Sequence, residues 1–175
     1  MATVGQPLNF ETADPAAPSG AINLTFQADA PTTPPTDVIR NISVYATFAY
    51  DIAIYFPTTQ SSASQEIFRY NCRRTLNFPA NFSGTVGGIS CISAGSAKTA
   101  ATGSTTFIVN RITSGVTTQI GTIVFAASGT VPTFTTTSGA VETLSVGDIL
   151  TVIGPATADA TLANWAVTLV STRTT

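Results

Sequence analysis

From about residue 48 onward, apolar, aromatic and β-branched residues alternate with polar ones at the two-residue period of half-buried strands. The stretches "ATFAYDIAIYFP" and "QEIFRYNCRRTLNFP" each end at a proline. The stretch "TTFIVNRITSGVTTQIGTIVFAAS" has two such runs on either side of Ser114-Gly115, which predicts a hairpin. Further short runs in "TVPTFTTTSGAVETLSVGDILTVIGP" are separated by the turn dipeptides Ser138-Gly139 and Gly147-Asp148.

Helical periodicity is weak in this sequence. No segment sustains an apolar period of three to four residues, and only "ATADATLAN", residues 156–164, is a candidate for a turn of helix. Roughly eight short strands with frequent turn signals are typical of an antiparallel sandwich. We therefore predict an all-β fold, an antiparallel jelly-roll-type sandwich over residues 48–175.

The segment before the sandwich has a different composition. Six of the ten prolines precede residue 48, and proline favours extended or polyproline conformations over helix. Within this segment only "AINLTFQA" is a strand candidate, so residues 1–47 are expected to form an extended Pro-rich N-terminal arm or connector. The arm either docks on a neighbouring subunit or partner, or is a solvated linker. Its candidate interface residues are the spaced apolar positions Leu8, Phe10, Ile22, Leu24 and Phe26.

The stretch "GDILTVIGPATADATLANWAVTL", residues 147–169, predicts a strand, a connector and a second strand. Asp148 is placed to accept hydrogen bonds from the amides of its own turn, and Asp159 with Thr161 is placed to cap the connector. Trp165 begins an alternating apolar face and is expected in the core. The alternative is a calcium site built from oxygen ligands of Asp148, Asp159 and Asn164. Because these residues are scattered and form no calcium-loop motif, we prefer the capping role.

Composition limits the possible functions. Only 9% of the residues are charged, against roughly 25% in an ordinary soluble domain. The formal charge of −2 gives no basic footprint for nucleic acid, and no apolar run approaches the length of a membrane-spanning helix. The N-terminus has neither the basic start nor the apolar core of a secretion signal, so we expect a protein made in a cytoplasm. A surface with so few charges favours burial against other chains.

The sequence contains few of the residue patterns that catalysis requires. The chain has no histidine, no G-x-S-x-G, no P-loop and no recognisable acid/base pair of carboxylates, so we expect no enzyme, no cofactor and no metal. Cys72 and Cys91 match no metal or redox motif and are expected as buried free thiols, with a disulfide between them as the alternative. Strand alternation in "RYNCRR" places Arg69 and Arg73 on one face and Arg74 on the other. These arginines either pair with carboxylates across a subunit interface or form a solvated face.

Four stretches carry a family resemblance: "IYFPTTQSSASQEIFRYNCRRTLNFPANFSGTVGG", "STTFIVNR", "IGTIVFAASGT" and "LSVGDILTVIGPATADATLANWAVTLVSTR". In this order they resemble a domain that recurs in structural proteins of tailed bacteriophages and prophages, over about residues 50 to 173. The closing pattern "GDxLTVxxPxxxDATLxxxxxTL" is the most specific part. This sequence departs from the family where "FPTTQSSASQ" lacks a glycine and where "RITSGVTTQ" replaces a shorter "KNG" turn. In the arm, "DPAAPSGAINLTFQADA" and "RNISVY" are similar to the connector that often precedes the domain.

The resemblance implies a surface-exposed virion protein, made in the cytoplasm of the host bacterium, that assembles as a homotrimer and contacts other virion structural proteins. Two roles stay open. One is a tail-tip or tail-fibre protein in contact with the host surface and a receptor there, which is the role that we favour. The other is a capsid decoration or cement protein whose N-terminal arm clamps neighbouring shell subunits. The resemblance identifies no catalytic residue.

Overall fold

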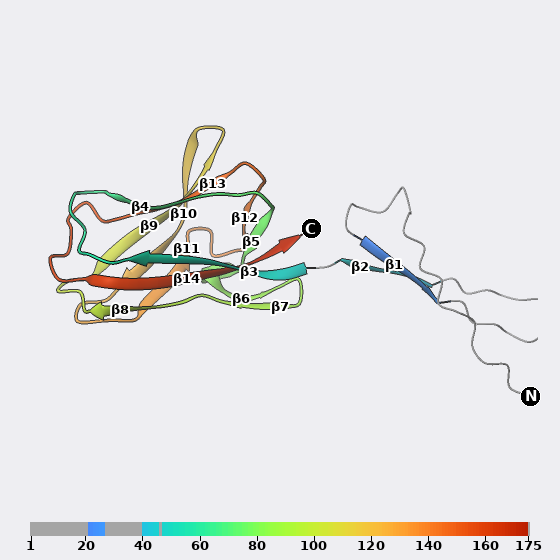
Figure 1. Ribbon diagram of the computed structural model, residues 1–175, viewed down its shortest axis with the longest axis horizontal. Coiled ribbons are helices and arrows are strands. Elements are labelled where there is room, and N and C mark those ends of the chain that lie inside the picture. Colours follow the sequence, from blue (N-terminus) through green and yellow to red (C-terminus); the bar gives the residue numbers. More distant parts are fainter. Residues whose placement is uncertain (1–20, 27–39, 46, 175) are drawn as a thin grey trace, which may run out of the picture. The chain divides into compact units, whose positions relative to one another are not determined.

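The computed structural model describes residues 21–26, 40–45 and 47–174 of the chain (Figure 1). The chain divides into two compact units, residues 1–46 together with 175, and residues 47–174. In the first unit, β1 (Ala21–Phe26) pairs antiparallel with β2 (Arg40–Tyr45). The sequence pattern predicted the first of these strands and missed the second. Leu8 and Phe10 lie outside the described residues, and Ile22, Leu24 and Phe26 occupy alternate positions of β1.

The second unit is an all-β sandwich, as predicted. It contains twelve strands where the pattern indicated roughly eight. They are β3 (Thr47–Phe56), β4 (Glu66–Asn71), β5 (Leu76–Phe78), β6 (Ser83–Val86), β7 (Ile89–Ile92), β8 (Ala94–Thr99), β9 (Thr105–Thr113), β10 (Val116–Phe125), β11 (Pro132–Thr136), β12 (Glu142–Leu144), β13 (Ile149–Ile153) and β14 (Ala163–Thr174).

Two antiparallel sheets form the sandwich. One has the order β11-β10-β9-β13-β4, and the other has the order β12-β5-β14-β3, with β8 also paired to β14. Figure 1 shows β4 and β13 above β3 and β14. Eight strands, taken in chain order as β3, β4, β5, β9, β10, β12, β13 and β14, pair first with last, second with seventh, third with sixth and fourth with fifth. This nested pairing is the connectivity of a jelly roll.

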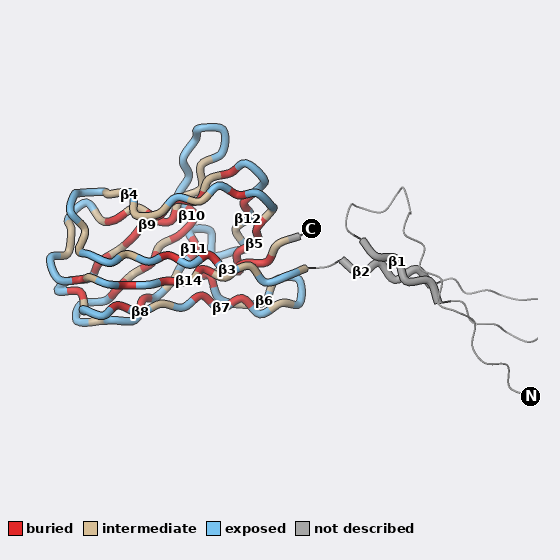
Figure 2. The backbone as a smooth tube through the Cα atoms, viewed as in Figure 1, coloured by how far each residue is buried: buried red, intermediate tan, exposed pale blue. Residues whose placement is uncertain are grey.

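Short insertions decorate this jelly roll. Strands β6 and β7 form a hairpin of their own, and β11 extends one sheet beyond β10. The hairpin between β9 and β10 turns at Ser114 and Gly115, both with positive φ, as a tight two-residue turn requires. Its tip is exposed and projects from the sandwich (Figure 2).

The core lies between the two sheets, where Figure 2 shows buried stretches along the strands. Trp165 is 1% exposed, and its ring centroid lies 4.8 Å from that of Phe107 and 5.8 Å from that of Phe56. Val167 and Leu169 are buried on the same face of β14, so the predicted alternation is confirmed.

One helical prediction was wrong. Residues 156–164 form bends and the first residues of β14, and no helical turn. The one helical element in the described sandwich is the 3-10 turn η1 (Ala80–Phe82), directly after Pro79. Asn81 and Phe82 there have positive φ, and the buried Phe82 ring packs on Phe78 with centroids 5.5 Å apart. Packing of Phe82 in the core therefore accounts for this turn, and helix propensity does not.

Candidate functional site

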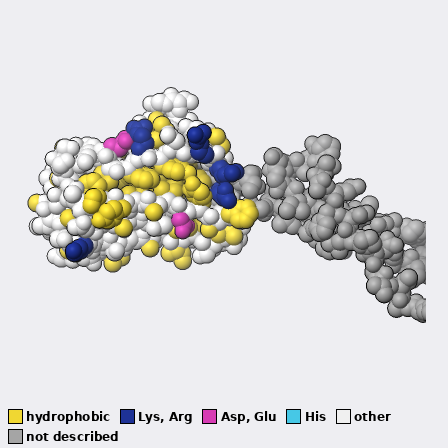
Figure 3. All heavy atoms as spheres, in the orientation of Figure 1, with side chains coloured by type: hydrophobic (Ala, Val, Ile, Leu, Met, Phe, Trp, Pro, Cys, Tyr) yellow, Lys and Arg dark blue, Asp and Glu magenta, His cyan; other side chains and the backbone are white. Residues whose placement is uncertain are grey.

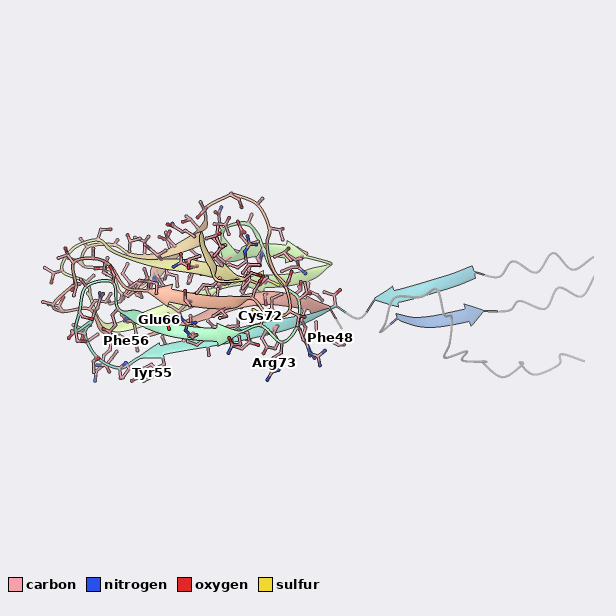
Figure 4. The ribbon with its side chains drawn as sticks, turned by 90° about the horizontal axis from the view of Figure 1, so that it is seen from above. Phe48, Tyr55, Phe56, Glu66, Cys72 and Arg73 are labelled. Atoms are coloured by element: carbon pink, nitrogen blue, oxygen red, sulfur yellow. The ribbon has the colours of Figure 1, made fainter. Side chains whose placement is uncertain are left out.

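The side of the sandwich formed by β3 and β4 is the most unusual surface that the structure describes. Strand β3 ends one sheet and β4 ends the other, so each has one edge without a strand partner among the described residues. Both edges border the same side of the sandwich, as the two views show (Figures 1 and 4). Unpaired strand edges offer free N–H and C=O groups to other chains.

Four aromatic side chains fill the gap between these two edges. They are Tyr50 and Phe56 of β3 with Phe68 and Tyr70 of β4, all partly buried against the core, and we call them the edge seam. Pairing with β13 explains the direction of the β4 residues, because Phe68 lies opposite Val152 and Tyr70 opposite Leu150, which are both buried. Figure 3 shows the seam side as an apolar stripe along the molecule.

A hydrogen bond joins the two sheets across the seam. The hydroxyl groups of Tyr50 and Tyr70 lie 2.7 Å apart, and their ring centroids are 6.4 Å apart. Burial and this hydrogen bond raise the pKa of Tyr70 to about 12, so its phenol is neutral at physiological pH. The seam side chains are therefore aromatic, and their two hydroxyl groups bond each other.

Charged groups border the seam. In β4, Arg69 donates from Nε and from Nη2 to the two carboxylate oxygens of Glu66, each at 2.7 Å. This bidentate pair is exposed, and the hydrogen bond from Arg69 lowers the pKa of Glu66. On β3, Asp51 is the single charged residue and is exposed.

The prediction for the arginine cluster was wrong in one respect. Arg73 and Arg74 follow the end of β4 in a bend, so they do not share its strand alternation with Arg69. Both are exposed, and neither has a carboxylate partner among the described residues. The local sequence could not show where β4 ends, because the end depends on a contact distant in sequence. Strand β4 stops before Cys72, which is buried in the core and whose N–H donates to the carbonyl of Asp148 at 2.8 Å.

The two ends of the seam differ in charge. Figure 4 places Phe48 and Arg73 at one end, and Tyr55, Phe56 and Glu66 at the other. At the first end, the guanidinium of Arg173 lies 5.3 Å from the centre of the Phe48 ring, a cation–π contact. Phe48 is 45% exposed and Tyr55 is 64% exposed. The seam thus runs from a cationic end to an end where the Glu66 carboxylate is paired with Arg69.

The acidic residues of the closing motif have structural roles, as the capping hypothesis predicted. Asp148 accepts from the N–H of Ser145 and from the hydroxyl of Thr113, each at 2.8 Å, and is buried. Asp159 accepts hydrogen bonds from two loops. Its Oδ2 atom accepts from the N–H groups of Thr102 and Gly103. Its other oxygen is bound by the N–H groups of Thr161 and Leu162.

These contacts bear on the alternative of a calcium site. The structure gives Asp148 and Asp159 separate hydrogen-bond partners, and it records no bond between either of them and Asn164. Within the described ranges, no three His, Cys, Asp or Glu residues gather as metal ligands do. The same ranges contain no helix that is long and apolar enough to cross a membrane.

Replacing Asp159 with alanine should destabilise the sandwich by about 1 kcal/mol, as loss of a capping carboxylate typically does. Burial raises the pKa of this carboxyl, but the N–H groups of Gly103, Leu162 and Thr161 outweigh burial and hold it well below its usual range. Its contribution is therefore present above the unfolded pKa of about 4 and is lost as the pH falls toward the folded value. Urea unfolding at pH 7 and pH 3 measures both effects. A difference between Asp159→Ala and wild type that stays constant between the two pH values would contradict this role.

The loop between β3 and β4 contains the "ASQ" part of the opening motif, and it packs directly on the closing motif. Gln60 donates from Nε2 to the carbonyls of Ser62 and Pro155, at 2.6 and 2.7 Å. The N–H of Ser64 bonds the carbonyl of Pro155 at 3.0 Å, and that of Gly154 bonds the carbonyl of Gln65 at 2.8 Å. The opening and closing motifs thus contact each other through backbone hydrogen bonds, and we call this contact the joint.

A recess next to this joint is too small for an ordinary ligand. Its volume is about 10 Å³, whereas ligand pockets span about 300–1,000 Å³. Its lining includes Gln60, Asp159 and Trp165, which already have structural roles.

The two cysteines are free and buried, Cys91 in β7 and Cys72 just beyond β4, as predicted. Burial raises the pKa of the Cys72 thiol to about 11, which disfavours a reactive thiolate.

The fold and the seam together define a jelly-roll sandwich with an aromatic edge that no other strand of the described ranges covers. Comparison with known proteins adds no relative, since the sequence matches no family model, no curated protein and no solved structure.

Proposed function

We propose that this chain is a non-enzymatic, oligomeric structural protein of a bacteriophage virion, associated with the tail tip or tail fibre and with contact to the host surface. The observation that carries the proposal is the edge seam, an aromatic stripe between two unpaired strand edges. Contiguous apolar surface of this kind typically marks a contact with another protein. The low charge of the chain supports the same role, because 9% charged residues provide little ionic surface for a monomer.

The phage context rests on the sequence resemblance over about residues 50 to 173, and the jelly roll is compatible with it because viral structural proteins often use this fold. Fold alone does not define function, so the virion role needs its own test. Under this proposal, the partners are further copies of the chain, other virion proteins and a receptor on the host.

Quantitative mass spectrometry of purified phage particles tests the proposal. The chain is expected in the particles at a few copies per virion, in a constant ratio to known tail proteins. Hundreds of copies per particle would instead indicate the decoration role on the capsid shell. Absence of the chain from particles that contain all other structural proteins would contradict both roles.

A further inference from the structure

The edge seam has the two properties that an interface between identical copies needs. Its strand edges are unpaired within the described sandwich, and the ten-residue strand β3 offers the N–H and C=O groups that point away from β14, with one charged side chain, Asp51. Its surface is aromatic and only partly buried. No described residue of the chain covers these two features, so the sandwich as described leaves apolar area exposed.

The two ends of the seam carry different charged groups, and this difference favours one orientation of a second copy. A two-fold interface brings the same patch of both copies together, so each end of the patch meets the opposite end of its copy. Here one end has Arg73 without a carboxylate partner among the described residues, and the other end has Glu66, which Arg69 of the same copy already binds (Figure 4). Head-to-tail reversal therefore places Arg73 of each copy beside the Glu66–Arg69 pair of the other, where the carboxylate can accept from a second guanidinium.

We propose that two copies of this chain associate across the edge seam about a two-fold axis that runs from one sheet to the other, perpendicular to the strands. In this arrangement β3 of one copy pairs antiparallel with β3 of the second copy, and β4 faces β4. The pairing extends both sheets across the interface and buries the seam aromatics, and Arg73 of each copy lies next to Glu66 of the other. The inference deepens the proposed structural function, on which it rests, by naming the surface and the partner. It replaces the homotrimer that the sequence resemblance implies with a two-fold assembly.

Asp51 is the one feature of β3 that opposes this pairing. A charge on an edge strand disfavours association with another strand, and the two-fold axis brings both copies of Asp51 to the same outer face. The charge therefore weakens the dimer without blocking it, and Asp51→Asn is expected to strengthen association.

The test is a charge exchange on the full-length chain, followed by light scattering and sedimentation. Wild type is expected at twice the chain mass of 18.0 kDa. Arg73→Glu places glutamates at both ends of the seam, and Glu66→Arg places arginines at both ends. Each variant alone should raise the dissociation constant about tenfold or more, because like charges then meet twice in every dimer.

Mixing the two variants provides the decisive measurement. Each variant carries the charges that the other lacks, so an equimolar mixture should form a heterodimer with an affinity near that of wild type. Lys98→Glu is the matched control, because it makes the same change of charge at an exposed residue of β8, away from the seam, and it should leave the mass unchanged. Circular dichroism with the β-spectrum of wild type shows that each variant is folded.

Four results would overturn the two-fold pairing: a wild-type monomer at about 100 µM, a mass three times that of one chain, a dimer that neither charge variant weakens, or variants that fail to associate on mixing. The particle experiment stands apart from this one. A chain that is found in virions but is monomeric or trimeric would remove the two-fold pairing and keep the virion function. A two-fold dimer that is absent from particles would remove the virion function and keep the two-fold pairing.

Discussion

Truncating Trp165 to alanine is expected to lower the free energy of unfolding by about 3–5 kcal/mol, the usual cost of removing a fully buried large aromatic side chain. The indole is the largest fully buried side chain and contacts three phenylalanine rings, those of Phe56, Phe107 and Phe125. The cavity left behind would adjoin the recess that Trp165 already lines, so the site could collapse only in part. Urea unfolding followed by circular dichroism measures the loss.

Tyr55→Ala is the matched control for this prediction. Tyr55 is also aromatic and lies in the strand that pairs with β14, but 64% of it is exposed, so its truncation should cost far less. Equal unfolding midpoints for Trp165→Ala and wild type would contradict the placement of Trp165 in the core.

Gly121→Ala is the second substitution with a large expected effect, about 1–3 kcal/mol of destabilisation from overpacking. A β-carbon at this position would run into the backbone carbonyl oxygen of Thr135 in the neighbouring strand and would lie 2.5 Å from the ring of Phe82. The Thr135 carbonyl belongs to β11, paired with β10 at this residue, so it has little freedom to move. Thermal unfolding of the variant should show a clearly lower midpoint.

Gly103→Ala provides the comparison, because nothing lies within 4 Å of the β-carbon that this change would add. Its stability should match that of wild type. If both glycine variants unfolded at the wild-type temperature, close packing of β10 against β11 and Phe82 would be incorrect.

Much of the sandwich could be predicted from the sequence because strand alternation is a local signal. The apolar positions of β14 follow the two-residue period, and Gly147 with Asp148 forms the expected turn before β13. The strand "RNISVY" was missed, since the prolines that precede it favoured an extended connector.

The candidate site was less accessible to sequence reasoning. Phe68 and Tyr70 have the pattern of ordinary core residues, and only the sheet order shows that β4 ends a sheet and leaves them half-buried. The position of Arg73 opposite the Glu66 end likewise depends on where β4 stops and on the direction of the strand. Such features arise from topology, which no local pattern encodes.

Hydrogen–deuterium exchange of the wild-type chain and the Arg73→Glu variant, at the same concentration, is the most direct test of the edge seam as the surface through which this protein assembles. Amides on the free edges of β3 and β4 should exchange slowly in wild type and faster in the variant, while β9 and β10 should be equally protected in both. Identical exchange in β3 and β4, or a difference confined to other strands, would contradict the account.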